Sequence, residues 1–390
     1  MNDFVFHSPT EFIFGRGVEV QAGERIARCG GRRVLIVCGG GSARRSGLLD
    51  RVVKALDDAG LAHALLEGVR PNPTDDKVRE GIRLGRAEGT DWLLAVGGGS
   101  VIDTAKAVAA GIRYAGDFWD FFDGSATVTE ALPIGVVLTI PAAGSEGSGN
   151  SVITKTATCQ KLSLRTPYVL RPKFALLNPE LTLTLPAWQT ACGITDMLAH
   201  IMERYFTNTP ATVVTDHVSE GLMQAIVEEA RRVTLNPQDY DARANLMWAG
   251  TLAHNGLCGT GCEEDWASHF MEHEVSAFYD VSHGAGLAVI FPAWLQWMAV
   301  HHATKVAQWA ERVWGVSPAA TPQATAEEGV RRFRAFLASI GMPLTLRELG
   351  IEHPDINRLA DSLHRNKGEF VGNYVRLTRK DTEEIYRLAQ

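Results

Sequence analysis

The chain has 390 residues, of which 45% are hydrophobic and 21% are charged, and this ordinary globular composition excludes disorder as the main state. Its length predicts two domains, with three as the alternative. Lys plus Arg number 38 and Asp plus Glu number 45, which gives a net charge of −7. Without a basic cluster, such a chain is a poor partner for nucleic acid or an anionic membrane.

We expect no targeting or membrane segment in this sequence. No apolar run approaches the roughly 18 residues that a membrane span needs. The first residues lack a basic segment before an apolar one, so we expect no secretory signal. The six cysteines form no C-x-x-C pair, which argues against a zinc ribbon or a disulfide framework. We therefore expect a cytoplasmic protein.

Three short apolar runs predict buried strands, at residues 33–38, 92–96 and 134–140. The first two end in glycines and are followed by segments with helical spacing, at 46–60 and 101–112. Strands that alternate with helices indicate βαβ units around a parallel sheet.

From about Pro186 the pattern changes to helical periodicity, and no convincing strand follows. A proline favours a break, so we expect an α/β domain of residues 1–185 and an all-helical domain of residues 186–390. A cleft between two such domains is the default place for a ligand. The helical periodicity covers residues 186–203, 212–233, 241–257, 265–278, 285–300, 302–315 and 322–340.

A run of three glycines, residues 97–99, follows the second strand and leads into a helix at Ser100. Glycines let the backbone approach a ligand closely, and the amide groups and dipole of a helix start favour phosphate. Asp103 and Lys106 follow about one turn later. The spacing matches neither G-x-G-x-x-G nor a Walker A loop. The turn predicts a phosphate site, with a purely structural turn of positive φ as the alternative.

A second glycine run, residues 39–41, also ends a strand, and Ser42, Arg44 and Arg45 come next. In dinucleotide-binding folds an acidic residue after a strand binds the ribose hydroxyls, whereas a nearby arginine accommodates a 2′-phosphate. This turn has no acid and two arginines, which favours NADP over NAD. The alternative is that both arginines are simply solvated. A third stretch, residues 139–150, either wraps a nicotinamide or ribose or forms a surface loop.

Histidines cluster in the second half of the chain. Asp196 and His200 are four residues apart in one helical stretch, so they project from the same face. His269 and His273 repeat this spacing, and His283 stands at the start of the next helix. Three imidazoles and one carboxylate are a plausible ligand set for a divalent metal. The alternatives are surface hydrogen bonds or a variant of the H-x-x-E-H hydrolase motif.

These features, in this order, resemble the iron-containing (group III) alcohol dehydrogenase family. Within it the chain is most similar to the branch of NADP-dependent butanol dehydrogenases and broad-range aldehyde reductases. The resemblance runs almost end to end, from Ser8 to Asn373. Its most specific parts are the glycine turn with Asp103 and Lys106, Pro71-Asn72-Pro73, Pro172-Lys173-Phe174 with Asn178-Pro179, Asp196 to His200, and Asp265 to His269 with His273 and His283.

The resemblance implies a metal site. Asp196, His200, His269 and His283 are expected to bind one divalent metal, either Fe(II) or Zn(II). His273 is then the additional histidine beside the nicotinamide and substrate, and we expect it to relay a proton.

The resemblance also implies the cofactor contacts, with NADP(H) preferred over NAD(H). Gly40 stands where NAD-using relatives carry an aspartate, and Ser42 follows as in NADP-using relatives. Lys161 matches a lysine that reaches the cofactor ribose, and Thr139 lies in the loop over the nicotinamide. One departure is Asn178, where aspartate is usual. The implied cofactor residues are Gly40, Gly41, Ser42, Asn72, Gly98, Gly99, Ser100, Asp103, Thr139 and Lys161.

The implied fold is an α/β dinucleotide-binding domain with a parallel sheet, then an all-α metal-binding domain, in a dehydroquinate synthase-like architecture. The implied reaction is hydride transfer between a nicotinamide and small primary alcohols or aldehydes in the interdomain cleft, and the family suggests a homodimer. The alternatives are a non-catalytic nucleotide- or metal-binding protein, a lyase or polyol dehydrogenase, and a metallohydrolase that uses Glu272 as its base.

Overall fold

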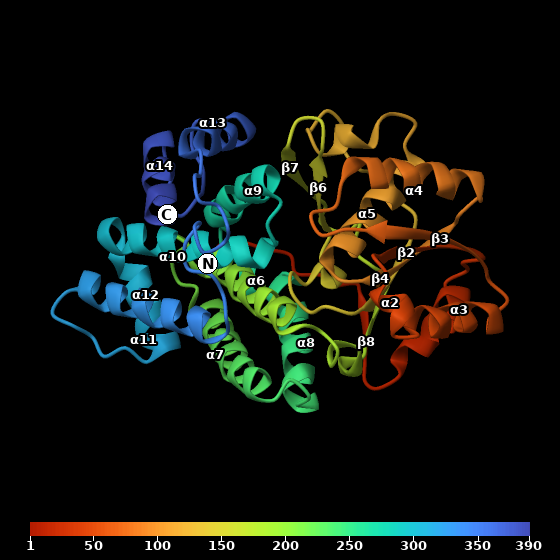
Figure 1. Ribbon diagram of the computed structural model, residues 1–390, viewed down its shortest axis with the longest axis horizontal. Coiled ribbons are helices and arrows are strands. Elements are labelled where there is room, and N and C mark those ends of the chain that lie inside the picture. The colour runs from red at the N-terminus through yellow and green to blue at the C-terminus, as the bar shows by residue number, and fades with distance from the viewer. The chain divides into compact units, whose positions relative to one another are not determined.

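The computed structural model describes all residues from Met1 to Gln390. The chain divides into two compact units, an α/β unit of residues 7–185 and a helical unit of residues 1–6 and 186–390 (Figure 1). No helix is both long enough and apolar enough to cross a bilayer.

The α/β unit is built on a six-stranded sheet in which every pair of neighbours is parallel. The central strands are short apolar runs whose residues are almost all buried, as expected for a sheet covered on both faces. In spatial order the strands are β1 (Glu11–Phe14), β8 (Phe174–Leu177), β5 (Ile134–Leu138), β4 (Trp92–Gly97), β2 (Arg33–Gly39) and β3 (Ala62–Val69).

Helices cover both faces of this sheet. α1 (Ala22–Arg28) and α3 (Leu48–Asp58) pack one face, where Ile26 and Leu56 share a core with Ile36 of β2. α4 (Asp75–Ala87) and α5 (Gly99–Arg113) pack the other face (Figure 1). These two helices approach closely at Gly111, where a Cβ would lie 2.2 Å from the side chain of Ile82.

The strand order places the predicted cofactor turns together. β3 lies on one side of β2 and the next strand, β4, lies on the other, so the order reverses between β2 and β4. Cys38 pairs with Val96, and Gly97 pairs with Leu138. The carboxyl ends of β2, β4 and β5 therefore lie side by side, where ligands bind in open α/β sheets.

A separate antiparallel hairpin joins this edge. It consists of β6 (Asn150–Lys155) and β7 (Gln160–Arg165), and the Thr154 amide donates to the Pro73 carbonyl at 2.8 Å. The sequence pattern did not predict this hairpin, nor β1, β3 or β8. β1 and β8 are only four residues long, and β3 is an edge strand with several exposed residues.

The helical unit contains no strand, only an isolated bridge between Val371 and Leu377. α10 (His283–His301) is apolar on nearly every side and forms the centre of the unit's core, since it packs against α6, α9, α12 and α14. The remaining helices are α6 (Ala187–Tyr205), α7 (Val213–Leu235), α8 (Tyr240–His254), α9 (Ala267–Tyr279), α11 (Ala303–Trp314), α12 (Pro322–Ser339), α13 (Ile356–Lys367) and α14 (Arg379–Leu388).

The parallel-sheet and all-helical fold class predicted from the sequence is confirmed. α13 and α14 lie beyond the last helix that the periodicity indicated. Residues 1–6, which the predicted N-terminal domain includes, pack instead with the helical unit. A backbone hydrogen bond holds this segment there, since the Asn2 amide donates to the Gly261 carbonyl at 2.9 Å.

Candidate active site

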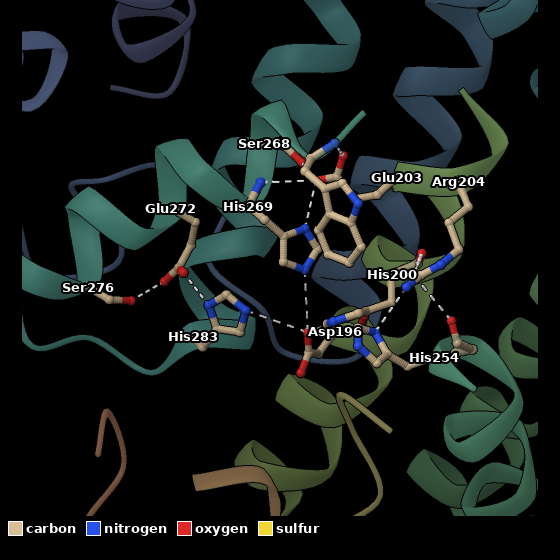
Figure 2. A network of polar contacts seen from close by, with 12 residues as sticks. Asp196, His200, Glu203, Arg204, His254, Ser268, His269, Glu272, Ser276 and His283 are labelled. Carbon is tan, nitrogen blue, oxygen red and sulfur yellow. Dashed lines mark hydrogen bonds and ion pairs between the residues drawn. The ribbon is translucent and has the colours of Figure 1, made fainter. Parts of the chain in front are cut away.

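Three helices of the helical unit bring the predicted metal ligands together (Figure 2). Asp196 and His200 project from the same face of α6, His269 lies in the first turn of α9, and His283 is the first residue of α10. The Asp196 Oδ1 atom is 3.9 Å from His269 Nε2 and 3.7 Å from His283 Nε2. It is 2.9 Å from His200 Nδ1. The four side chains thus meet at one carboxylate oxygen.

Each of the three imidazoles has its Nδ1 atom held by an acceptor. His269 Nδ1 donates to Glu203 Oε1 at 2.7 Å, and His200 Nδ1 donates to the Asp196 backbone carbonyl at 2.9 Å. His283 Nδ1 donates to Glu272. Because carboxylates and carbonyls only accept, the proton of each neutral ring sits on Nδ1 and the Nε2 lone pair is free to bind a metal.

The residues present fit a divalent cation. His269 Nε2 is buried and has no hydrogen-bond partner in the protein, and Asp196 Oδ1, 3.9 Å away, has only His200 Nδ1 within hydrogen-bond distance. Both atoms carry lone pairs and face each other, an arrangement that costs free energy unless a cation lies between them. Three imidazole nitrogens and one carboxylate oxygen are a suitable ligand set for Fe(II) or Zn(II).

The electrostatics of this centre keep two of its residues, Asp196 and His269, in their metal-binding forms. Burial would raise the pKa of Asp196, but the neighbouring imidazoles outweigh it and hold the pKa well below its usual range. Burial holds the pKa of His269 well below its ordinary value. The centre therefore contains an ionised carboxylate and a neutral ring near pH 7.

Glu203 is a functional candidate that the sequence analysis missed. Its buried carboxylate accepts from His269 Nδ1, from the His269 and Trp266 amides at 3.0 and 2.7 Å, and from the Ser268 hydroxyl. It therefore fixes both the ring and the start of α9. The available signal was its position in α6, because Glu203 stands seven residues after Asp196 and so lies on the same helix face.

Glu272 is the second carboxylate behind the centre (Figure 2). It is fully buried and accepts from His283 Nδ1 and from the Ser276 hydroxyl. Gly286 leaves room for it, since a Cβ there would lie 2.5 Å from Glu272 Oε1. A carboxylate engaged in this way is a positioning group, which argues against its use as the base of a metallohydrolase.

Two further histidines lie beside the centre. The ring of His273 is centred 5.6 Å from that of His283, and the side chain is buried. His254 packs edge-on against His200, with ring centroids 4.4 Å apart, and its Nδ1 lies 3.3 Å from Arg204 Nη2. His254 therefore supports the ring of His200.

In the α/β unit, the predicted phosphate turn is the start of α5. Gly98 is the N-cap residue of α5 and supplies no side-chain cap. The backbone amide groups of Gly99 and Ser100 therefore remain available for an anion. A Cβ on Gly98 would lie 2.9 Å from Ile140 Cβ, so this position has no room for a side chain. The arrangement fits the pyrophosphate of a dinucleotide.

Asp103 and Lys106 brace the loop after β5. Asp103 Oδ1 accepts from the Ser145 hydroxyl at 2.6 Å and Oδ2 accepts from the Val152 amide at 2.9 Å. Lys106 is fully buried and donates to the Ser145 and Asn150 carbonyls at 2.7 and 2.8 Å. Both carboxylate oxygens of Asp103 thus accept hydrogen bonds from other residues of the same unit. A direct contact between Asp103 and a cofactor stays a prediction.

The other predicted cofactor residues lie at the same edge of the sheet. The Thr139 amide donates to the Gly97 carbonyl at 3.0 Å, directly after β5. Lys161 of β7 donates to Asn72 Oδ1 at 3.0 Å, and Asn72 has φ +52°. Gly40 and Gly41 form the turn between β2 and α2 (Ser42–Arg45), Gly41 has φ +109°, and Ser42 is the first residue of α2.

A parallel sheet with glycine turns at its order reversal, together with a buried carboxylate and three imidazoles in a helical unit, is the arrangement of a nucleotide-linked oxidoreductase. Comparison with known families agrees. The model of iron-containing alcohol dehydrogenase matches residues 9–179, and that of the C-terminal part of the Fe-containing alcohol dehydrogenase family matches residues 190–390. The chain belongs to the iron-containing alcohol dehydrogenase family, and the predicted family is confirmed.

Individual relatives cover the whole chain. NADH-dependent butanol dehydrogenase A of Clostridium acetobutylicum is 38% identical over 99% of both chains, and the NADPH-dependent aldehyde reductase YqhD of Escherichia coli is 34% identical over 100% of both. The crystal structure of NADH-dependent butanol dehydrogenase A from Thermotoga maritima has a TM-score of 0.96 at 38% identity, covering 100% of this chain and 99% of that one. The protein is therefore an NAD(P)H-linked oxidoreductase of the alcohol dehydrogenase and aldehyde reductase type.

Proposed function

We propose that the protein interconverts small primary alcohols and aldehydes, with one divalent metal bound by Asp196, His200, His269 and His283. The observation that carries this proposal is the convergence of one carboxylate and three imidazoles whose Nδ1 atoms are all held by acceptors. The named butanol dehydrogenases and aldehyde reductase support this substrate class.

The chain's residues have distinct tasks in this reaction. A divalent metal supplies a Lewis acid for the substrate oxygen, and a nicotinamide supplies or receives the hydride. Glu203 and Glu272 orient the rings of His269 and His283, so the ligands are preorganised. His273, one helical turn after His269, is the ring that we propose to hold and pass on the proton of the alcohol.

For the cofactor, we propose a preference for NADP(H) over NAD(H), bound at the turns 39–42 and 97–100. The absence of an acid in the first turn supports this preference, as does Arg45, which has no carboxylate partner. The butanol dehydrogenases above are named NADH-dependent and YqhD NADPH-dependent, so relatives of both kinds exist.

Two further parts of the proposal concern setting and assembly. All six cysteines are free thiols, which supports the expected reducing cytoplasm. The homodimer and the interdomain location of the reaction stay predictions.

The testing experiment is an anaerobic assay of the purified chain, loaded with Fe(II) or Zn(II) and given butanal with NADPH or NADH. We expect metal-dependent loss of absorbance at the nicotinamide band, faster with NADPH than with NADH. A preference for NADH would overturn only the cofactor preference. Absence of turnover with either metal, either cofactor and a panel of short aldehydes would overturn the proposed function.

A further inference from the structure

The glycine turn after β2 contains no acidic residue, but an acidic residue of the neighbouring strand β3 lies close to it. Arg44, in α2, directs its guanidinium at Glu67 of β3, with Nη2 2.8 Å and Nε 3.2 Å from Glu67 Oε1. The next arginine, Arg45, has no such carboxylate. A Cβ on Gly41 would lie 3.1 Å from Arg45 Nη1, so this second guanidinium lies over the turn.

An irregularity in β3 places Glu67 at this position. Val37 pairs with Leu66, but Gly39 pairs with Val69, so β3 has one more residue than β2 between the two pairs. Such a bulge redirects a side chain, and bulges are common beside binding sites. The extra residue is accommodated at Gly68, whose φ is +84°.

The charge of Glu67 acts on the carboxyl end of β2. The pKa of the Cys38 thiol is raised to about 11. Burial is the larger cause, and the negative charge of Glu67 raises this pKa further. The nearby ammonium group of Lys77 does not neutralise Glu67, because it pairs with Glu80 Oε2 at 2.7 Å and contacts only the Glu67 backbone carbonyl. The carboxylate therefore has Arg44 as its cation.

We propose that Glu67 is a specificity-determining residue that limits the preference for NADP(H) over NAD(H). Its carboxylate neutralises Arg44 and repels a 2′-phosphate, whereas an uncharged ribose 2′-hydroxyl meets no such penalty. Arg45, which lies over the turn without a carboxylate partner, then favours the phosphate. This inference rests on the proposed binding of the cofactor ribose at the turn 39–42.

The test is calorimetric titration of the full chain with 2′,5′-ADP and with 5′-AMP, which need neither nicotinamide nor metal. Glu67→Gln is expected to tighten 2′,5′-ADP binding about tenfold, the effect of one charge-assisted contact, and to change 5′-AMP binding less than about threefold. Arg44→Gln is expected to weaken 2′,5′-ADP binding. The double variant removes both charges and is expected to return to within about threefold of the unmodified chain.

Asp58→Asn is the matched control, because it removes one negative charge from an exposed ion pair with Lys54 in α3. Glu67 and Arg44 are 44% and 55% exposed, so neither substitution is expected to move the melting temperature by more than about 3 °C. A Glu67→Gln variant with an unchanged ratio of the two affinities would overturn the inference alone. Failure of both ligands to bind the unmodified chain would overturn the inference and the proposed cofactor site together.

Discussion

The Nδ1 atom of His269 donates to Oε1 of Glu203 at 2.7 Å, and both side chains are almost completely buried. A carboxylate behind a histidine fixes the tautomer and orientation of the ring and makes its other nitrogen a better ligand. Glu203 makes this bond while also accepting two backbone amides at the start of α9. The ligand is thus fixed in place by α6 before any metal binds.

Glu203→Gln is expected to lower the affinity for the divalent metal about 10- to 100-fold, because the ring of His269 loses its charged acceptor. The measurement is competition between the protein and a chelator of known affinity. Glu229→Gln is the control, since it removes a carboxylate of the same unit that pairs only with Arg232. Unchanged metal affinity in Glu203→Gln would contradict the positioning role.

The roles of His269 and His273 are separable. His269→Ala is expected to lose the metal, because its Nε2 faces Asp196. His273→Ala is expected to keep one equivalent of metal and to lower kcat about 10²- to 10⁴-fold, the usual range for a lost acid–base group. Metal content per chain and steady-state rates distinguish the two. Loss of metal in His273→Ala would show that this ring belongs to the ligand set.

Gly98→Ala is expected to weaken nucleotide binding at least about tenfold, because its Cβ would lie 2.9 Å from Ile140 at the predicted phosphate turn. Metal content is expected to stay the same. The control is Gly221→Ala in α7, where a Cβ meets nothing within 4 Å. This control is expected to stabilise the protein by about 0.5–1 kcal/mol. Equal nucleotide affinities in the two variants would contradict the role of Gly98.

Lys106 makes stability depend on pH. Burial lowers its pKa from 10.5 to about 8, an effect that the charges of Asp103 and Glu146 only partly offset. Between these two values the unfolded chain binds more protons than the folded one, so the free energy of unfolding rises with pH. We expect a gain of about 1–3 kcal/mol from pH 8 to pH 10 relative to Lys106→Met.

Urea denaturation of the two proteins across this pH range measures the difference. The comparison with Lys106→Met cancels the titration of other groups that the two proteins share. A difference in unfolding free energy that stays constant or falls as the pH rises would contradict the buried, destabilised ammonium.

The features that the sequence predicted correctly are those that depend on the local pattern of residues. The strands at 33–38 and 92–96, the helical half of the chain and the convergence of Asp196 with His200 follow from apolar runs and from four-residue spacing. Glu203 and Glu67 could not be found in this way. Glu203 acts across helices on His269, and Glu67 reaches Arg44 only because β3 pairs with β2 through a bulge.

The same limit applies to Asp103 and Asn178. The motif around Asp103 indicated a phosphate site. The carboxylate oxygens of Asp103 instead accept hydrogen bonds from Ser145 and Val152, which are more than 40 residues away in the sequence. Asn178 departs from the aspartate usual in the family, and its amide donates to Glu19 Oε2 at 2.9 Å, which a carboxylate could not do. The roles of Asp103 and Asn178 depend on residues that are distant in the sequence and meet only in the folded chain.

The most direct test of the account is an anaerobic titration of the metal-free chain with Co(II), followed by visible absorbance. Saturation is expected at one equivalent, with the bands of a low-coordinate nitrogen and oxygen site, and those bands are expected to be lost in Asp196→Ala and His269→Ala. Saturation that survives both substitutions, or no binding by the unmodified chain, would contradict a metal centre built from these residues.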